Sequence, residues 1–241
     1  NSSGSTSIRY GVTRDKVLQI DGVLSDGSLV SFKELTSKEF KLKTQIKSLE
    51  GSIYASIYNE LSQELVQQEI KNQFPKPSIH RRNTGYAVDE LLDSDLFGGK
   101  DPSINIAKLL SGSEGTLVFS TAITLQLDTV QPKESVIIAS HFESIKESLK
   151  ATVLAMNHEL YACELMDKVI LDCTKNNREQ AKNRFFIEGD PEAILMFEVS
   201  GDTKEEAQKK ADELISNLNE NNYGYHHPKV VGENIKRMFN L

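Results

Sequence analysis

Residues Gly112-Ser113-Glu114-Gly115-Thr116-Leu117 stand directly before an apolar, strand-like stretch that runs to Leu127. Two glycines around a Ser-Glu pair permit a tight turn and a close approach of the backbone to a neighbouring group. The alternating residues that follow are typical of a β-strand. Taken alone, this stretch predicts a turn that enters a strand.

The overall composition is that of an ordinary folded protein. Of the 241 residues, 38% are hydrophobic and 26% are charged, which is enough apolar side chain for one large core or two smaller ones. The net charge of −7 provides no long-range attraction to nucleic acid or to an anionic membrane. No run of the sequence has the length and apolar character of a membrane span. We therefore expect a cytoplasmic protein, and peripheral association with a membrane stays open.

The first half of the chain predicts a hairpin followed by helices. Lys16–Leu24 and Leu29–Phe32 are strand candidates on either side of an Asp26-Gly27 turn. From Thr36 to about Asn72, apolar residues recur at three- and four-residue steps, which predicts an amphipathic helical segment. Gly51 interrupts it, so we expect two helices or one bent helix. The stripe comprises Leu42, Ile46, Leu49, Ile53, Ile57, Leu61 and Leu65.

Residues 78–104 lack a clear period and predict a long ordered or functional loop. A short helix at Asn105–Leu110 is expected to lead into the Gly112 turn. Leu117–Leu127 is expected to form one or two strands.

The second half of the chain predicts alternating strands and helices. Strand candidates are Val136–Ala139, Leu160–Leu165 and Ala193–Val199, and Tyr223–Tyr225 is expected to close the sheet as an edge strand. Asp202 or Thr203 is expected to cap a long helix. The order β-α-β, then β-α-β, is the split pattern of a ferredoxin-like sandwich. Apolar stripes that predict helices are Phe142, Ile145, Leu149, Val153 and Met156, then Met166, Val169, Ile170 and Cys173, then Ala207, Ala211, Leu214, Ile215 and Leu218.

No metal site is expected from the cysteines or histidines. Cys163 and Cys173 lack a CxxC partner and lie in apolar stretches, a pattern that fits buried thiols. Adjacent histidines in a strand point to opposite faces, so His226 and His227, which precede Pro228, favour a surface linker over a chelating pair. The other two histidines of this half, His141 and His158, are expected to be polar ends of core elements.

Three segments have the composition that a dinucleotide flavin requires of its binding loops. The pyrophosphate and ribityl oxygens need backbone N–H donors, and close approach favours Gly, Ser and Thr over bulky side chains. Residues 1–11, 82–86 and 111–116 have this composition. Each segment alone is typical of a plain turn, and Glu114 is as well suited to accept backbone N–H bonds as to contact a ligand.

In order and approximate spacing, these motifs resemble the FAD-linked oxidases of the vanillyl-alcohol-oxidase superfamily. Within it, the resemblance is to the branch of D-lactate, glycolate and D-2-hydroxyacid dehydrogenases, including members with an additional iron–sulfur region. Motifs carry the likeness over residues 1 to about 127, and the order of elements carries it beyond. The motifs are Asn1-Ser2-Ser3-Gly4, Arg9-Tyr10-Gly11, Val23-Leu24-Ser25-Asp26-Gly27, Arg82-Asn83-Thr84-Gly85-Tyr86 and Gly112 to Leu117.

The resemblance implies an α+β fold within a longer parent enzyme. Residues 1–131 would form the second subdomain of its FAD-binding domain, with a helical insertion at about 36–73, and residues 132–241 the first half of a ferredoxin-like cap domain. A D-2-hydroxyacid of the lactate or glycolate type would be oxidised by hydride transfer to the flavin, and an electron acceptor would complete the reaction. The implied flavin contacts are Asn1, Ser2, Ser3, Gly4, Arg9, Tyr10, Gly11, Glu114, Gly115 and Thr116.

Two departures from the family pattern shape what we expect of this chain. The acidic residue that follows the family's turn is absent from Phe119-Ser120-Thr121-Ala122. The family's Gly-rich pyrophosphate loop and catalytic histidines are expected outside these residues, so the isolated chain is expected to be colourless and inactive, with no catalytic residue. Arg82 is a candidate for binding a substrate carboxylate, since Arg suits bidentate anion binding, although a solvated charge run is the simpler interpretation.

A function of a different class stays open. The helices of residues 36–72 could dock a partner, which would make the chain a non-catalytic binding or assembly module. An apolar stripe at helical spacing more often belongs to the core.

Overall fold

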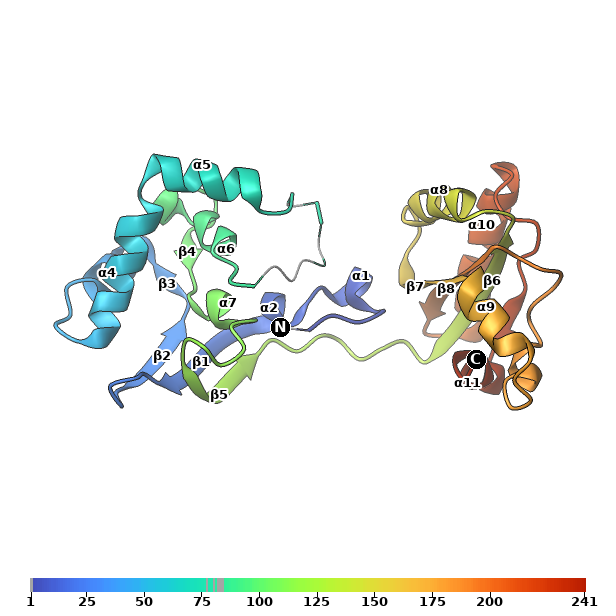
Figure 1. Cartoon of the computed structure of the whole chain (residues 1–241), viewed down its shortest axis with the longest axis horizontal. Helices are drawn as coiled ribbons and strands as arrows, with labels where there is room; N and C mark the ends of the chain where they lie inside the picture. The colour runs from blue at the N-terminus through green and yellow to red at the C-terminus, as the bar shows by residue number, and fades with distance from the viewer. Residues whose placement is uncertain (1, 77, 80, 82–84) are drawn as a thin grey trace. The chain divides into compact units, whose positions relative to one another are not determined.

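The computed structural model describes residues 2–76, 78, 79, 81 and 85–241. Contacts divide the chain into two units: the first takes in residues 1–4 and 11–128, and the second residues 5–10 and 129–241. Figure 1 shows the elements of both.

The first unit is built on a three-stranded antiparallel sheet in the order β2-β1-β5. The predicted hairpin is confirmed: Val23 pairs with Leu29, and Asp26 accepts hydrogen bonds from both the backbone and the hydroxyl of Ser28. Gly27 has a φ of +82°, which a glycine adopts without steric cost. The strands are β1 (Val17–Val23), β2 (Leu29–Lys33) and β5 (Phe119–Leu125).

Helices and short elements cover one side of this sheet. The helix predicted before the Gly112 turn is confirmed as α7 (Ala107–Leu110), with the Asn105 side chain accepting the Ala107 N–H at 2.9 Å. The helical insertion forms α3 (Ser37–Lys43), α4 (Leu49–Leu61) and α5 (Glu64–Gln73). The shorter elements are α2 (Thr13–Lys16), β3 (Leu35–Thr36), α6 (Asp89–Leu92), η1 (Asp95–Phe97) and β4 (Ser103–Ile104).

The sequence predicted a break or bend of the helical insertion at Gly51, but the helix continues through this residue. The breaks lie before Leu49 and after Leu61, and Ser48 caps α4 by accepting the Gly51 N–H. A Cβ atom at Gly51 would collide with the carbonyl oxygen of Ile46. Glycine is therefore needed because the preceding turn packs against the first turn of α4, and its low helix propensity does not end the helix.

Tyr54 anchors α4 to the core of the first unit. Its side chain is 1% exposed, and its ring meets Phe40 edge-on at 4.9 Å between centroids and Phe32 at 6.3 Å. The predicted stripe is only partly buried: Leu61 lies in the core, whereas Leu42, Ile46 and Leu65 are exposed. Leu49, Ile53 and Ile57 are half-buried.

The second unit contains a four-stranded antiparallel sheet in the order β7-β8-β6-β9. Two interleaved β-α-β units give this order, and the predicted α+β class is confirmed. Side chains of α8 and α10 pack with one face of the sheet, and those of α9 and α11 with the other. The elements are α1 (Ser7–Tyr10), β6 (Glu134–Phe142), α8 (Ile145–Ala155), β7 (Leu160–Asp167), α9 (Lys168–Lys175), η2 (Ala181–Arg184), β8 (Ala193–Gly201), α10 (Lys204–Glu220), β9 (Lys229–Val231) and α11 (Glu233–Phe239).

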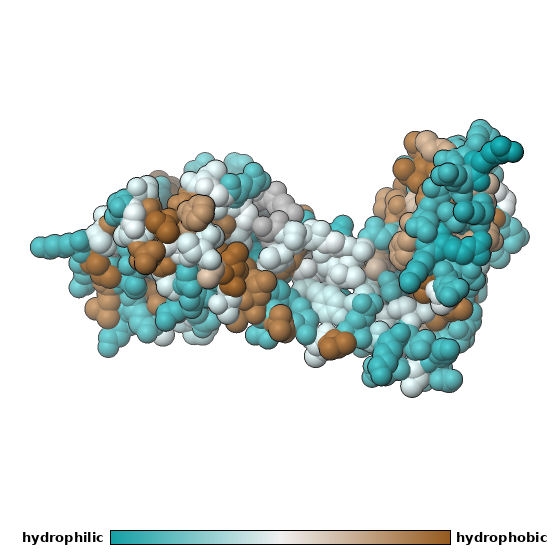
Figure 2. Space-filling view, turned by 90° about the horizontal axis from the view of Figure 1, so that it is seen from below, coloured by the Kyte–Doolittle hydropathy of each residue, from teal (hydrophilic) through white to brown (hydrophobic). Residues whose placement is uncertain are grey.

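Helix α10 follows its sequence pattern, but α8 does not. Thr203 caps α10, and its apolar stripe is buried except for the half-buried Ile215. In α8 the stripe faces outward: Leu149 is 56% exposed and Val153 is 73% exposed. The face toward the sheet carries Ser148, Ala151 and Ala155, because small residues let the helix approach closely. Figure 2 shows hydrophobic residues on the visible surface of both units.

Two further expectations for the second unit were wrong. Phe142 belongs to strand β6, not to the helix that follows. Cys173 is exposed, because α9 buries Leu171 and Thr174 instead, while half-buried Cys163 has its thiol pKa raised to about 11 by burial.

The predicted edge strand at Tyr223–Tyr225 was also wrong. The edge strand is β9, and Gly224 has a φ of +73°, which does not continue an extended strand. The Gly224 N–H donates to the Glu147 carboxylate at 2.7 Å, and the Tyr225 N–H donates to the His141 carbonyl at 3.0 Å. Among the residues described, no helix has the length and apolar character needed to cross a membrane.

Helix propensity alone predicts that alanine at Gly51 stabilises the protein. The packing around Gly51 predicts the opposite change in the free energy of unfolding. We expect Gly51→Ala to destabilise the first unit by about 1–3 kcal/mol, because the added methyl group forces the backbone apart. Ser52→Ala, at the next and exposed position of α4, should change the free energy of unfolding by less than about 1 kcal/mol. Urea unfolding followed by circular dichroism measures both, and a Gly51→Ala variant more stable than the wild type would contradict the packing.

Candidate functional site

The Gly112 turn is held in left-handed backbone conformations. Gly112, Glu114 and Gly115 have φ values of +99°, +53° and +74°, and a positive φ at a residue with a Cβ atom is uncommon. Ser113 closes the turn: its N–H donates to Leu110, and its carbonyl accepts the N–H of Thr116 at 3.0 Å and the Thr116 hydroxyl at 2.6 Å. A Cβ atom at Gly115 would meet no atom within 4 Å, so the turn presents open backbone on that side.

A buried arginine fixes the start of this turn. Arg14 is 3% exposed, and its guanidinium donates to the carbonyl of Lys108 at 3.1 Å and to the carbonyl of Ser111 at 2.8 Å. These carbonyls lie in the last turn of α7 and just after it, where a helix has unpaired acceptors and a partial negative charge. Sequence reasoning missed Arg14, because one arginine in a short polar run gives no local sign of burial.

Several described residues in or beside the predicted flavin motifs form hydrogen bonds within the first unit. The Tyr86 hydroxyl lies 2.6 Å from the Thr116 hydroxyl, which joins the segment before α6 to the Gly112 turn. Arg81 donates to the Gly4 carbonyl at 3.1 Å. Ser2 and Thr13 join their hydroxyls at 2.9 Å. The predicted residues Asn1, Arg82, Asn83 and Thr84, and His80 beside them, lie outside the described residues.

A groove of about 340 Å³ runs beside the turn. One side is polar and comes from Thr13 and residues 111–115. The other side is apolar and includes Val17 and Ile20 of β1 and Ile123 of β5. A polar backbone turn facing an apolar sheet suits a ligand that has both a polar and an aromatic part.

Not all predicted flavin residues belong to this unit. Gly11 does, with a φ of +73°. Arg9 and Tyr10 end helix α1, which is assigned to the second unit. There Tyr10 meets Tyr161 edge-on at 5.7 Å between ring centroids and accepts its hydroxyl hydrogen bond at 3.2 Å. Burial, together with this contact, raises the pKa of Tyr161 to about 12.

A separate histidine cluster lies in the second unit. His141 is fully buried, with Nδ1 2.7 Å from the Ala139 carbonyl and Nε2 accepting the Glu188 N–H at 3.1 Å. Burial lowers its pKa to about 4. His226 pairs with the Glu188 carboxylate at 3.2 Å, and His227 Nδ1 lies 2.8 Å from the Ser140 hydroxyl. His226 and His227 thus pack against β6 and do not form the surface linker that was predicted. Among the described residues, no group of three His, Cys, Asp or Glu is placed to hold a metal ion.

One known protein family is similar to the second half of the chain. Residues 131–232 match the family of FAD linked oxidases, C-terminal domain. The predicted resemblance to that group is confirmed, and FAD as the cofactor of the parent protein agrees with it.

Curated proteins similar to this chain include D-2-hydroxyglutarate dehydrogenases. The Pantoea ananatis protein is 23% identical over 222 residues, and the Pseudomonas putida protein is 25% identical over 222 residues; each alignment covers 90% of this chain and 21% of the relative. The Escherichia coli protein is 25% identical over 181 residues, 73% of this chain and 16% of the relative. The chain thus spans about a fifth of the length of the first two relatives. An alkyldihydroxyacetonephosphate synthase structure aligns with 98% of this chain and 34% of its own, at 12% identity and a TM-score of 0.47.

The Arg14 anchor predicts a large loss of stability on its removal. Arg14→Met keeps the apolar stem but leaves two carbonyls of the α7 end without their donor, which we expect to cost about 2–4 kcal/mol. Arg81→Met removes an exposed guanidinium that also donates to a carbonyl, and should cost less than about 1 kcal/mol. Urea unfolding gives both values, and amide exchange at Ser113 and Thr116 should accelerate only in Arg14→Met. Equal losses in the two variants would contradict the anchor.

The buried His141 predicts that the second unit loses stability in mild acid. The unfolded state takes up a proton near pH 6.5, whereas folded His141 does so only near its lowered pKa of about 4. Stability from the neutral ring is therefore present above pH 6.5 and falls by up to about 3 kcal/mol as the pH drops to 4. Glu188, His226, His227 and Tyr225 surround the ring. His141→Gln should flatten this slope in urea unfolding at pH 4.5–7, and an unchanged slope would contradict the assignment.

Proposed function

We propose that this chain is part of an FAD-dependent oxidoreductase that oxidises a D-2-hydroxyacid by hydride transfer to the flavin. The observation that carries the proposal is the match of residues 131–232 to the C-terminal domain of FAD-linked oxidases. The D-2-hydroxyglutarate dehydrogenases similar to most of the chain support the hydroxyacid class. When bound, FAD supplies the hydride acceptor, and the residues of this chain bind and orient it.

The flavin-binding part would be residues 1–131, and the Gly112 turn would contact the cofactor. The backbone N–H groups of Glu114 and Gly115 can donate to phosphate or ribityl oxygens, because no side chain blocks Gly115. Ser2–Gly4 and Gly11 would add backbone from the amino-terminal segment. Asn1, Arg9 and Tyr10 remain proposed flavin residues, and Arg82 remains a proposed carboxylate ligand.

Residues 132–241 would form a ferredoxin-like cap that covers the substrate side of the flavin. We propose no catalytic residue and no metal ligand within the chain. An iron–sulfur cluster and the contact with the electron acceptor would belong to other parts of the parent protein. Lactate and glycolate are the substrates proposed from the sequence resemblance, and 2-hydroxyglutarate is the one that the relatives' names suggest.

Spectroscopy of the parent protein tests this function. We expect the protein purified under native conditions to be yellow, and its flavin to be bleached anaerobically by a D-2-hydroxyacid but not by its L-enantiomer. Separate titrations with D-lactate, glycolate and D-2-hydroxyglutarate identify the substrate. A colourless protein that takes up no FAD, or a flavin that none of the three acids reduces, would contradict the proposal. The isolated 241-residue chain should be colourless, and stoichiometric FAD bound with micromolar affinity would refute that part.

A pair of glycine variants tests the role of the turn. Gly115 and Gly27 both have a positive φ, and a Cβ atom at either position meets open space. Alanine at each should therefore strain the backbone by a similar amount, about 1–2 kcal/mol. In the parent protein, Gly115→Ala should weaken FAD binding at least tenfold, and Gly27→Ala should leave it unchanged. Equal FAD affinities in the two variants would contradict a flavin contact at the turn.

A further inference from the structure

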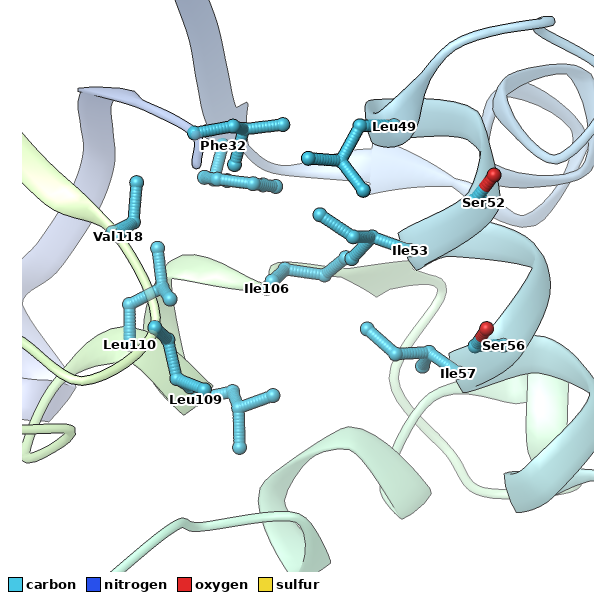
Figure 3. A pocket seen from close by; sticks show the side chains of 12 residues that line it. Phe32, Leu49, Ser52, Ile53, Ser56, Ile57, Ile106, Leu109, Leu110 and Val118 are labelled. Carbon is cyan, nitrogen blue, oxygen red and sulfur yellow. The ribbon is translucent and has the colours of Figure 1, made fainter. Parts of the chain in front are cut away.

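The first unit contains an apolar cavity that the flavin proposal does not use. It has a volume of about 390 Å³ and lies between α4 and the segment of α7 and β5. Figure 3 shows the side chains of Leu49, Ile53 and Ile57 pointing from α4 into the cavity. From the opposite side it is lined by Leu109, Leu110 and Val118.

Among the described residues, the lining contains no charged side chain, and its polar side chains are those of two serines. Ser52 and Ser56 lie one helical turn apart on α4, and both are exposed. Leu117, which also lines the cavity, is 41% exposed. The cavity therefore opens to solvent at a rim that carries two hydroxyl groups.

The packing of Tyr54 holds α4 in the position that leaves this space open. The Tyr54 ring packs against Phe40, which is not part of the lining, and against Phe32, which is. The turn before α4 is seated on Gly51, where no Cβ atom fits. A shift of α4 toward α7 would have to pull Tyr54 away from Phe40, so this contact keeps the cavity open.

We propose that this cavity binds a neutral amphiphile, a small molecule with an apolar body and one uncharged hydrogen-bonding group at the serine rim. A charged ligand would bury its charge without a partner, which is costly. An extended peptide would bury N–H and C=O groups against helix walls whose backbone is already paired. The volume is two to three times that of a cavity of ~150 Å³ that holds benzene, which corresponds to a ligand of roughly 15 non-hydrogen atoms.

Fluorescence titration of the 241-residue chain tests the proposal. N-phenyl-1-naphthylamine, which brightens in apolar surroundings, should bind saturably with one site per chain. 1-Decanol should displace it at a concentration at least tenfold below that of decanoate at pH 7.5, because the cavity offers the carboxylate no cation. The comparison separates the proposed neutral class from fatty-acid binding.

Filling variants locate the site. Ile53→Trp and Leu109→Trp add bulk from opposite walls, and each should weaken binding of the probe at least fivefold. Leu65→Trp, at a position that is 80% exposed on α5, adds the same ring outside the cavity and should leave binding unchanged. Circular dichroism and the melting temperature establish that each variant is folded, and the two walls give independent tests if one variant fails to fold.

Several results would overturn the proposal. They are no saturable probe binding at tens of micromolar, binding that neither filling variant weakens, and displacement by decanoate as strong as that by decanol. A dimer of the chain that dissociates in Ile53→Trp would assign the cavity to a second copy and would also overturn it. Sedimentation velocity with and without decanol detects that case.

Discussion

A guanidinium buried inside a small unit must find acceptors, because a buried charge without partners is strongly unfavourable. Arg14 finds them at the carboxyl end of α7, where the Lys108 and Ser111 carbonyls have no helical donor. This contact joins two segments about a hundred residues apart in sequence. Strand β1 begins three residues after Arg14, and β5 begins shortly after the Gly112 turn, so the same contact sets where β1 and β5 meet. The turn, the groove beside it and the central sheet of the first unit all depend on that placement.

The elements predicted correctly from the sequence are those whose signals are local. The Asp26-Gly27 hairpin needs only its turn residues and the alternation on either side. Helix α10 carries its own N-cap at Thr203 and a continuous stripe of Ala and Leu, so its start and its buried face could be predicted together. The α+β class follows from the order of such elements, and the motifs of residues 1 to about 127, taken together, predicted the resemblance to FAD-linked oxidases.

The errors arise where a partner distant in sequence decides the outcome. In α8 the larger apolar residues predicted the buried face, but close approach to the sheet requires Ser148, Ala151 and Ala155 there. Gly51 was interpreted as a helix break because its contact with the turn at Ile46 is a tertiary contact. Arg14 was overlooked because its acceptors lie in another segment. These contacts form between segments that the local sequence pattern does not relate to one another, so the pattern could not predict them.

The cavity and the groove of the first unit are not independent spaces. Leu110 and Val118 line both of them, one residue at the end of α7 and the other just before β5. Protein interiors are close-packed and pass small displacements to their neighbours. An occupant of the cavity would therefore restrain the two side chains that flank the Gly112 turn, and Arg14 already restrains the turn through Ser111. The buried Arg14 thus restrains the backbone of Glu114–Thr116 through Ser111. A ligand in the cavity would restrain the same backbone through the packing of Leu110 and Val118.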